Sequence, residues 1–242
     1  ADLIFGLNRE QQLKYPFYKN YTYVTLSSPE VAWAYEEAMN LSDHPEVLKA
    51  TGISRTDVFF DQKFIAEAFE KLHRQMPQSQ GKKVILYAPT FRGRVAHGKA
   101  PDRLDIRMFK EALNEEYVLL IKQHPLVRIR PEVPEDCREF AMDVTESMAI
   151  DDLLCVSDIC ISDYSSLVFE YSLFERPMIF FAYDKAEYDD WRGFYYNYEE
   201  MTPGPICTEN EEMLDYIQHL DTRFDHQQVA DFKYKFMRSC DG

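Results

Sequence analysis

Glycine is scarce in this sequence, and the familiar glycine-rich phosphate loops are missing. Only 8 of the 242 residues are glycine, and neither a P-loop nor a GxGxxG fingerprint is present. The HExxH and GxSxG signatures are also absent, which disfavours a zinc protease and an α/β-hydrolase. Any ligand site must therefore be built from other residues.

The chain also lacks a long apolar run and a cationic leader. No uncharged apolar stretch approaches the about 18 to 20 residues that cross a bilayer. Its five cysteines contain no CxxC pair, which disfavours a disulfide framework and a zinc knuckle. We expect a chain of the reducing cytoplasm that neither spans a membrane nor is secreted. No metal cluster or cofactor motif is evident, and metal dependence stays open.

Positive charge is scarce overall but concentrated in one stretch. The net charge of −15 disfavours binding to DNA or RNA, which requires a cationic surface. Residues 82–130 nevertheless hold eleven Lys and Arg against five Asp and Glu, a net +6, while the remainder carries −21. This window indicates either a site for a phosphorylated ligand or a solvated basic face.

The second two thirds of the chain alternates short apolar runs with helical patterns. Continuous rather than alternating hydrophobicity indicates strands that are buried on both faces, and hence a mainly parallel sheet between helices. The sequence therefore predicts a Rossmann-like α/β fold. The expected strands are 83–88, 117–121, 158–161 and 177–181, and the expected helices are 105–114, 148–156, 165–175, 209–220 and 226–238.

Two helices are expected before this region. The spacing of Ser27 and Glu30 suits a capping box for a helix over 27–41. A second helix over 62–75 ends at Met76-Pro77, and the polar residues 78–81 follow as a linker. We therefore expect one unit over 1–77 and a Rossmann-like domain over 78–242.

Ligands of such sheets bind beyond the carboxyl ends of the strands. Polar side chains follow three expected strands, in segments 89–94, 122–125 and 162–166. Two of these loops belong to the cationic window, which favours the phosphate-site interpretation over the solvated face.

Several residues of these loops have both a functional and a structural interpretation. Ser165 and Ser166 can donate hydroxyls to a phosphate at a helix start, or simply cap that helix. Asp163 suits a role in orienting backbone. His124, held extended before Pro125, can bond a phosphoryl oxygen or protonate a leaving group, although a lone histidine is usually structural.

The remaining candidates are weaker on sequence alone. Arg92 can grip phosphate in a bidentate fork or pair with a surface acid, and Arg192 follows the last strand. Glu170 can bond ribose hydroxyls or face solvent. The aromatic stretch 183–198 can stack a base or pack in the core. The basic and aromatic segment 232–238 suits either a membrane surface or, as we favour, docking on the sheet.

Several motifs together resemble the CDP-glycerol:poly(glycerophosphate) glycerophosphotransferase family. TGISRTD at 51–57 is similar to the family's TGxPRxD segment, with Ser54 in place of proline. The match covers roughly residues 20 to 220 in order. The other motifs are ILYAPTFRG at 85–93, IKQHP at 121–125, CISDYSSLVFEYSLFERPMIFF at 160–181, RGFYYN at 192–197 and PGP at 203–205.

The resemblance implies a GT-B architecture, in which two Rossmann-like domains face a cleft and the carboxyl-terminal one holds the donor. Residues 1–77 would then be the end of the acceptor-side domain plus a linker, and 78–242 the donor domain. The implied reaction moves glycerol phosphate from CDP-glycerol, or a related CDP-polyol, to a hydroxyl of a lipid-linked teichoic-acid-like or capsular polymer. CMP is released, at the cytoplasmic membrane face.

The resemblance also assigns residues. It implies a catalytic role for His124 at the donor pyrophosphate, with Ser165 and Ser166 beside it and Arg92 and Arg192 as anion clamps. The other donor-side residues are Thr90, Asp163 and Glu170.

One departure concerns the general base. The family's amino-terminal domain carries a WHG motif, whereas the only His-Gly pair here is His97-Gly98, in the wrong region. We therefore expect a fragment that binds nucleotide without turnover. The alternatives are a CDP-ribitol or nucleotide-sugar transferase of the same fold, and a nucleotide-binding module without catalysis.

Overall fold

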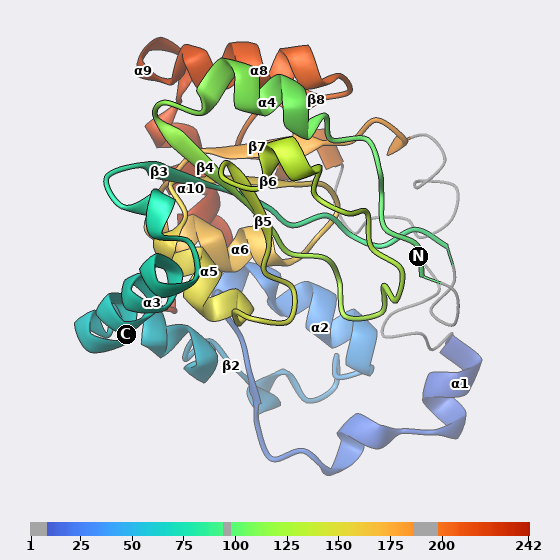
Figure 1. Ribbon diagram of the computed structural model, residues 1–242. Coiled ribbons are helices and arrows are strands. Elements are labelled where there is room, and N and C mark those ends of the chain that lie inside the picture. The colour runs from blue at the N-terminus through green and yellow to red at the C-terminus, as the bar shows by residue number, and fades with distance from the viewer. Residues whose placement is uncertain (1–8, 94–97, 186–197) are drawn as a thin grey trace.

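A six-stranded, all-parallel sheet forms the centre of the molecule (Figure 1). The computed structural model describes residues 9–93, 98–185 and 198–242. Strand order is β5-β4-β3-β6-β7-β8, the doubly wound order whose direction of winding reverses between β3 and β6. The strands are β3 (Lys83–Tyr87), β4 (Tyr117–Ile121), β5 (Ala141–Asp143), β6 (Ile159–Ser162), β7 (Met178–Phe181) and β8 (Ile206–Cys207).

Helices cover both faces of this sheet (Figure 1). Along β3, Val84 and Leu86 enter the core on one face, while Ile85 and Tyr87 enter the core on the other. This explains the continuous apolar runs. The first face is covered by α3 (Gln62–Gln75), α5 (Ile150–Val156), α6 (Leu167–Tyr171) and α10 (His226–Met237), and the second by α4 (Ile106–Leu113) and α8 (Asn210–Gln218), with α9 (Leu220–Arg223) following.

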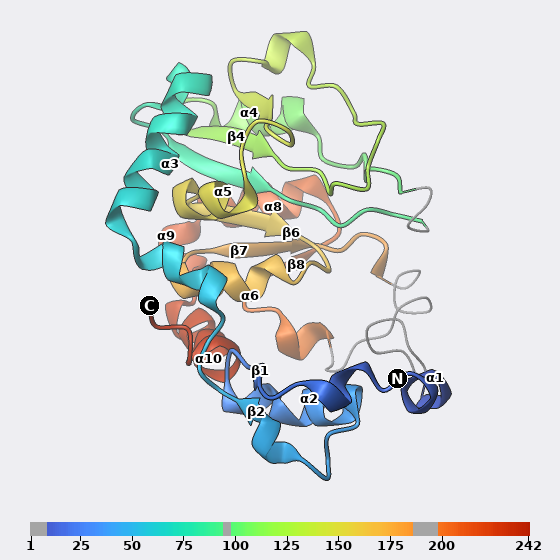
Figure 2. The same cartoon turned by 90° about the horizontal axis from the view of Figure 1, so that it is seen from below.

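The amino-terminal segment lies beside the carboxyl-terminal end (Figure 2). Ser239 N–H donates to the carbonyl of Ser27 at 3.0 Å, and Arg238 pairs with Glu30 at 2.8 Å. The part of this segment around residues 27–30 is thereby held to the end of α10. The elements of this segment are α1 (Arg9–Lys14), β1 (Val24–Thr25), α2 (Ala32–Met39) and β2 (Leu48–Lys49), with β1 and β2 paired in parallel.

The predicted Rossmann-like sheet is confirmed, and two elements match the prediction residue for residue: α3 and β4. The helix expected over 27–41 is shorter. It starts as a 3-10 turn over Pro29–Val31, where Ser28 rather than Ser27 accepts from Glu30 N–H at 3.3 Å. It ends at Asn40, whose φ of 51° places it in the left-handed region.

The expected linker is a packed turn. Ser79 is buried and donates its hydroxyl to the Met76 carbonyl at 2.7 Å, and Met76 is itself fully buried. Helix α3 packs against α5, so its apolar face belongs to the core that covers the sheet. The division of the chain into two units at residue 77 stays a prediction. Helix α3, which precedes it, packs on the core of the sheet.

The carboxyl-terminal helix α10 docks on the protein. The Phe169 ring on α6 lies 5.3 Å from that of Phe232 and 5.2 Å from that of Phe236, centroid to centroid, and both α10 rings are buried. Tyr234 on the same helix is exposed. Over the described residues, none of the helices has the length and apolar character that crossing a bilayer requires.

Candidate functional site

A cavity of about 560 Å³ lies beyond the carboxyl ends of β3, β4 and β6. The winding of the sheet reverses between β3 and β6, so the cavity occupies the switch point where doubly wound sheets bind ligands. Its walls come from segments 88–91, 122–125 and 164–167, which follow the three strands, together with Arg55, Ile150 and Glu170. Thus Thr90, His124, Ser165, Ser166 and Glu170 converge on one site.

His124 is half-buried at the exit of β4. The Leu126 N–H donates to His124 Nδ1 at 3.2 Å, so the proton of the neutral ring resides on Nε2. The ring packs against Phe91 at a centroid distance of 4.8 Å. These contacts orient the imidazole and make Nε2 its hydrogen-bond donor.

The two serines differ in their surroundings. Ser165 Oγ accepts from Leu167 N–H at 3.3 Å, so this side chain partly caps the following helix. Ser166 is exposed, and its hydroxyl makes no hydrogen bond to the described part of the chain. Ser166 is therefore the more available donor for a ligand.

Asp163 holds the loops together. It is buried, and its Oδ1 accepts from Thr90 N–H at 2.8 Å, Thr90 Oγ at 2.7 Å and Tyr164 N–H at 2.6 Å. In the same connection, Ser162 Oγ donates to the Ala88 carbonyl at 2.7 Å. The loops after β3 and β6 are thus tied to each other, and Asp163 does not line the cavity.

Arg92 lies outside the cavity wall. Its NH1 is 2.8 Å from Asp163 Oδ2, and its Nε donates to Asp184. Burial by itself would lower the pKa of Arg92, but the bonds to these two carboxylates raise it overall. The structure therefore places this guanidinium between two acids and not among the residues that line the cavity. Arg192, like most of the aromatic stretch 183–198, lies outside the described residues.

Two cations that sequence reasoning did not select do line the cavity: Arg55 and Lys122. Arg55 is 2.6 Å from Asp151 Oδ1 and 3.2 Å from Glu170 Oε2, and burial raises the pKa of Glu170. Arg55 belongs to the TGISRTD motif far upstream, so only the family resemblance could have drawn attention to it.

Lys122 is held by backbone carbonyls. Its Nζ donates to the carbonyls of Thr145 at 2.7 Å and Met148 at 2.6 Å, and burial lowers its pKa. The neighbouring Gln123 is buried with no hydrogen-bond partner at Oε1 among the described residues. A hydrogen-bond donor of a ligand can pair with this oxygen, and such pairing is favourable because a buried acceptor without a partner costs free energy.

The cationic window does not gather at one place. Lys122 lines the cavity, whereas Arg107 pairs with Asp136 on the surface and Lys82 donates to the carbonyl of Asn114. The charge count therefore indicated the right loops, but overstated the number of cations at the site. What remains is an imidazole N–H, hydroxyls, an ammonium and a guanidinium around one cavity, a set suited to phosphate oxygens.

This doubly wound sheet, with a polar cavity at its switch point, defines an α/β domain of the GT-B-like class. The chain belongs to the CDP-Glycerol:Poly(glycerophosphate) glycerophosphotransferase family, which matches residues 6–242. The family membership that the motifs predicted is thereby confirmed.

Curated relatives are teichoic acid enzymes. The chain is 38% identical over 228 residues to the teichoic acid poly(ribitol-phosphate) polymerase of Bacillus spizizenii, covering 93% of this chain and 36% of that protein. It is 34% identical to the teichoic acid ribitol-phosphate primase of the same organism (98% and 60%). It is 31% identical to the teichoic acid glycerol-phosphate primase of Bacillus subtilis (93% and 55%). The chain thus spans about a third to three fifths of these relatives.

A solved structure of the wall teichoic acid polymerase TagF superposes with a TM-score of 0.81 at 27% identity, over 99% of this chain and 59% of that one. A variant of TagF soaked with CDPG superposes with a TM-score of 0.80 at 28% identity, over 97% and 58%. The likeness covers nearly all of the present chain.

Proposed function

We propose that this chain supplies the donor site of a transferase that moves glycerol phosphate from CDP-glycerol to a hydroxyl of a teichoic-acid-like or capsular polymer, with release of CMP. The cavity at the switch point carries the proposal, because it gathers His124, Ser165 and Ser166 within one polar enclosure. Membership of the family and the relatives' names support the substrate class. A lipid-linked acceptor at the membrane face is part of the same proposal.

In the proposed step, the acceptor hydroxyl oxygen bonds to the phosphorus that carries glycerol, and the bond from that phosphorus to the CMP oxygen breaks. The hydroxyl proton leaves to a base that we do not assign within the cavity. Such transfers depend on positioning and on stabilising charge spread over the phosphoryl oxygens. In this proposal His124 Nε2–H donates to the departing phosphate; the Leu126 N–H at Nδ1 supports this role, because it leaves Nε2 to carry the proton.

The charges in this proposal come from Lys122 and Arg55. Both line the cavity, where Arg55 also pairs with Asp151 and Glu170, whereas Arg92 is not among the lining residues. Arg92 therefore supports the loop that carries the serines. Glu170 is assigned to a ribose hydroxyl. Its Oε2 lies 3.2 Å from Arg55 NH2, and this ion pair sets the position of the carboxylate.

CDP-ribitol is the second candidate donor. Sequence identity to the relatives above supports it. The two relatives named for ribitol phosphate are 38% and 34% identical to this chain, whereas the glycerol-phosphate primase is 31% identical.

A binding titration tests the proposal on the chain itself, with CDP-glycerol, CDP-ribitol, CMP and UDP-glucose as ligands. We expect a CDP-polyol to bind more tightly than CMP and UDP-glucose, and Lys122→Met to weaken it. Lys63→Met, which changes a cation on the exposed side of α3, is the matched control. Preference for UDP-glucose would favour a nucleotide-sugar transferase, and absence of nucleotide binding would refute the donor-site assignment.

A further inference from the structure

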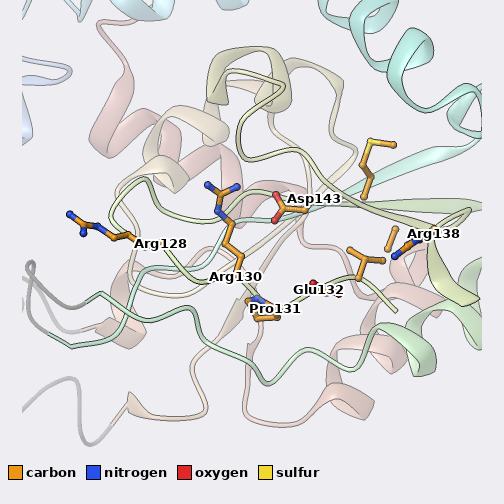
Figure 3. A pocket seen from close by; sticks show the side chains of 9 residues that line it. Arg128, Arg130, Pro131, Glu132, Arg138 and Asp143 are labelled. Carbon is orange, nitrogen blue, oxygen red and sulfur yellow. The ribbon is translucent and has the colours of Figure 1, made fainter. Parts of the chain in front are cut away.

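A second cavity, of about 640 Å³, lies along the edge strand β5 (Figure 3). It is separate from the cavity at the switch point, called the donor cavity below, because the two share no lining residue. Three arginines from two segments contribute to its wall. The lining comprises Arg128, segment 130–133, Arg138 and segment 141–143.

Two of these arginines have no acidic partner. They share this with Arg74, Arg103 and Arg176 among the described residues, whereas Arg107 pairs with Asp136, for example, and Arg223 with Asp215. Within residues 9–93, 98–185 and 198–242, neither Arg128 nor Arg138 forms an ion pair, although the protein as a whole is strongly acidic. Two arginines without an ion pair on the wall of one hollow form an anion-binding arrangement.

The third arginine also has unmet hydrogen-bonding capacity. Arg130 pairs with Glu146, yet its Nε is buried and has no partner in the described parts of the chain. A buried donor without a partner costs free energy unless a ligand or water satisfies it. Figure 3 shows the Arg130 side chain beside Asp143, between Arg128 and Arg138.

The carboxylates of the wall do not cancel this preference. Asp143 Oδ1 accepts from Thr145 N–H at 2.8 Å, so this group is occupied in forming the turn after β5. Glu132 is exposed at the rim. The lining carries three guanidiniums against two carboxylates, a net +1, and the carboxylate oxygens can accept hydrogen bonds from hydroxyl groups. Phosphate groups joined by hydroxylated carbons match that combination.

One loop contributes residues to both cavities. His124 lines the donor cavity, and Arg128 follows it by four residues, with a turn in which Val127 N–H donates to the His124 carbonyl at 2.9 Å. Four residues span at most about 14 Å even when fully extended. A polymer whose end is at the donor cavity could therefore reach Arg128 within a short length of chain.

We propose that the Arg128–Arg138 cavity binds phosphate groups of the polyol phosphate acceptor chain, as a subsite outside the reacting centre. The proposal rests on the proposed function, because that function supplies a polyanionic acceptor. A polymer carries several phosphates, so a second anion site increases the affinity of the protein for the polymer. The affinity for the CDP-linked donor does not increase.

The test compares binding of a synthetic glycerol phosphate oligomer of several repeats with binding of CDP-glycerol. In the double variant Arg128→Gln/Arg138→Gln, we expect oligomer affinity to fall by at least about tenfold and CDP-glycerol affinity to stay within about twofold. Both side chains are exposed, so the fold should persist, and circular dichroism checks it. Arg74→Gln, an exposed arginine at the end of α3, is the control for simple loss of charge.

Unchanged oligomer affinity, or an equal loss in the Arg74 control, would overturn the proposal. A separate arm uses vesicles of phosphatidylglycerol and phosphatidylcholine, because Ile129 between the two arginines is 87% exposed and could enter a membrane surface. Loss of vesicle binding with oligomer binding intact would assign the surface to lipid and refute the acceptor subsite. Failure of CDP-glycerol to bind the parent chain would instead count against the donor site.

Discussion

Arg92 NH1 lies 2.8 Å from Oδ2 of Asp163, while the other oxygen of the same carboxylate accepts both the N–H and the hydroxyl of Thr90. The loops after β3 and β6 are therefore joined by a buried ionic network on the side of the donor cavity. Asp184 completes it by accepting from Arg92 Nε. This network explains how a loop can present Thr90 and the two serines together.

Replacing Arg92 should destabilise the fold. Arg92→Ala leaves the buried Asp163 carboxylate without its ionic partner, and we expect the free energy of unfolding to fall by about 3 to 5 kcal/mol. Urea denaturation followed by circular dichroism measures it. In the matched control Arg107→Ala, the lost pair with Asp136 is mostly exposed, and the expected loss of stability is much smaller than for Arg92→Ala. Equal costs for the two variants would show that the network contributes little.

His124 should act on turnover and not on folding. In the protein at its full natural length, His124→Ala should lower kcat by about a hundredfold or more, because a positioned proton donor is lost. CMP release measures the rate. The control is His44→Ala, since His44 also precedes a proline but is exposed and interacts with Glu46. If His124→Ala retains turnover within about tenfold of the parent, the imidazole has no role in the chemistry.

Long periodic segments were predictable, and short ones were not. The amphipathic pattern of α3 and the unbroken apolar run of β4 each extend over a full element, so their boundaries could be assigned from the sequence. The edge strands β5 and β8 have three and two residues. Segments of that length show no periodicity, and their pairing depends on the neighbouring strand.

The candidate site was predictable where it follows the strands. His124 and Ser166 come directly after expected strands, so the parallel topology brings them together. Arg55 could not be placed in this way, because its 3-10 segment reaches the cavity through the packing of distant elements. Arg92 was placed near the site, but its pairing with two carboxylates depends on Asp163 and Asp184, which lie 71 and 92 residues further along.

Gly204, in the PGP segment, should not tolerate a side chain. A Cβ at this position would overlap the backbone carbonyl oxygen of Met178 on β7. We expect Gly204→Ala to lower the free energy of unfolding by about 2 to 3 kcal/mol, because the strand would have to shift. Gly81→Ala is the control: its φ of 78° is strained for alanine, but its Cβ would contact nothing, so about 1 kcal/mol is expected. Denaturation midpoints that rank the two in the opposite order would refute the packing explanation.

Glu170 should make stability depend on pH in a defined direction. Burial raises its pKa above the ordinary value of 4.5, with Arg55 opposing and Asp151 adding to the shift. A raised folded-state pKa contributes stability that is complete below about pH 4.5 and is lost as pH rises through the folded-state value. Glu170→Gln does not titrate, so its stability relative to the parent chain should increase from pH 5 to pH 7.5.

Urea denaturation at several pH values between 5 and 7.5 measures that difference. Glu67→Gln, which changes a carboxylate on the exposed side of α3, supplies the reference slope. A relative stability of Glu170→Gln that stays flat would mean that the pair with Arg55 at 3.2 Å fully offsets the burial of the carboxylate. A relative stability that falls with rising pH would show that the ionised form of Glu170 is favoured in the cavity, and that Arg55 is its dominant partner.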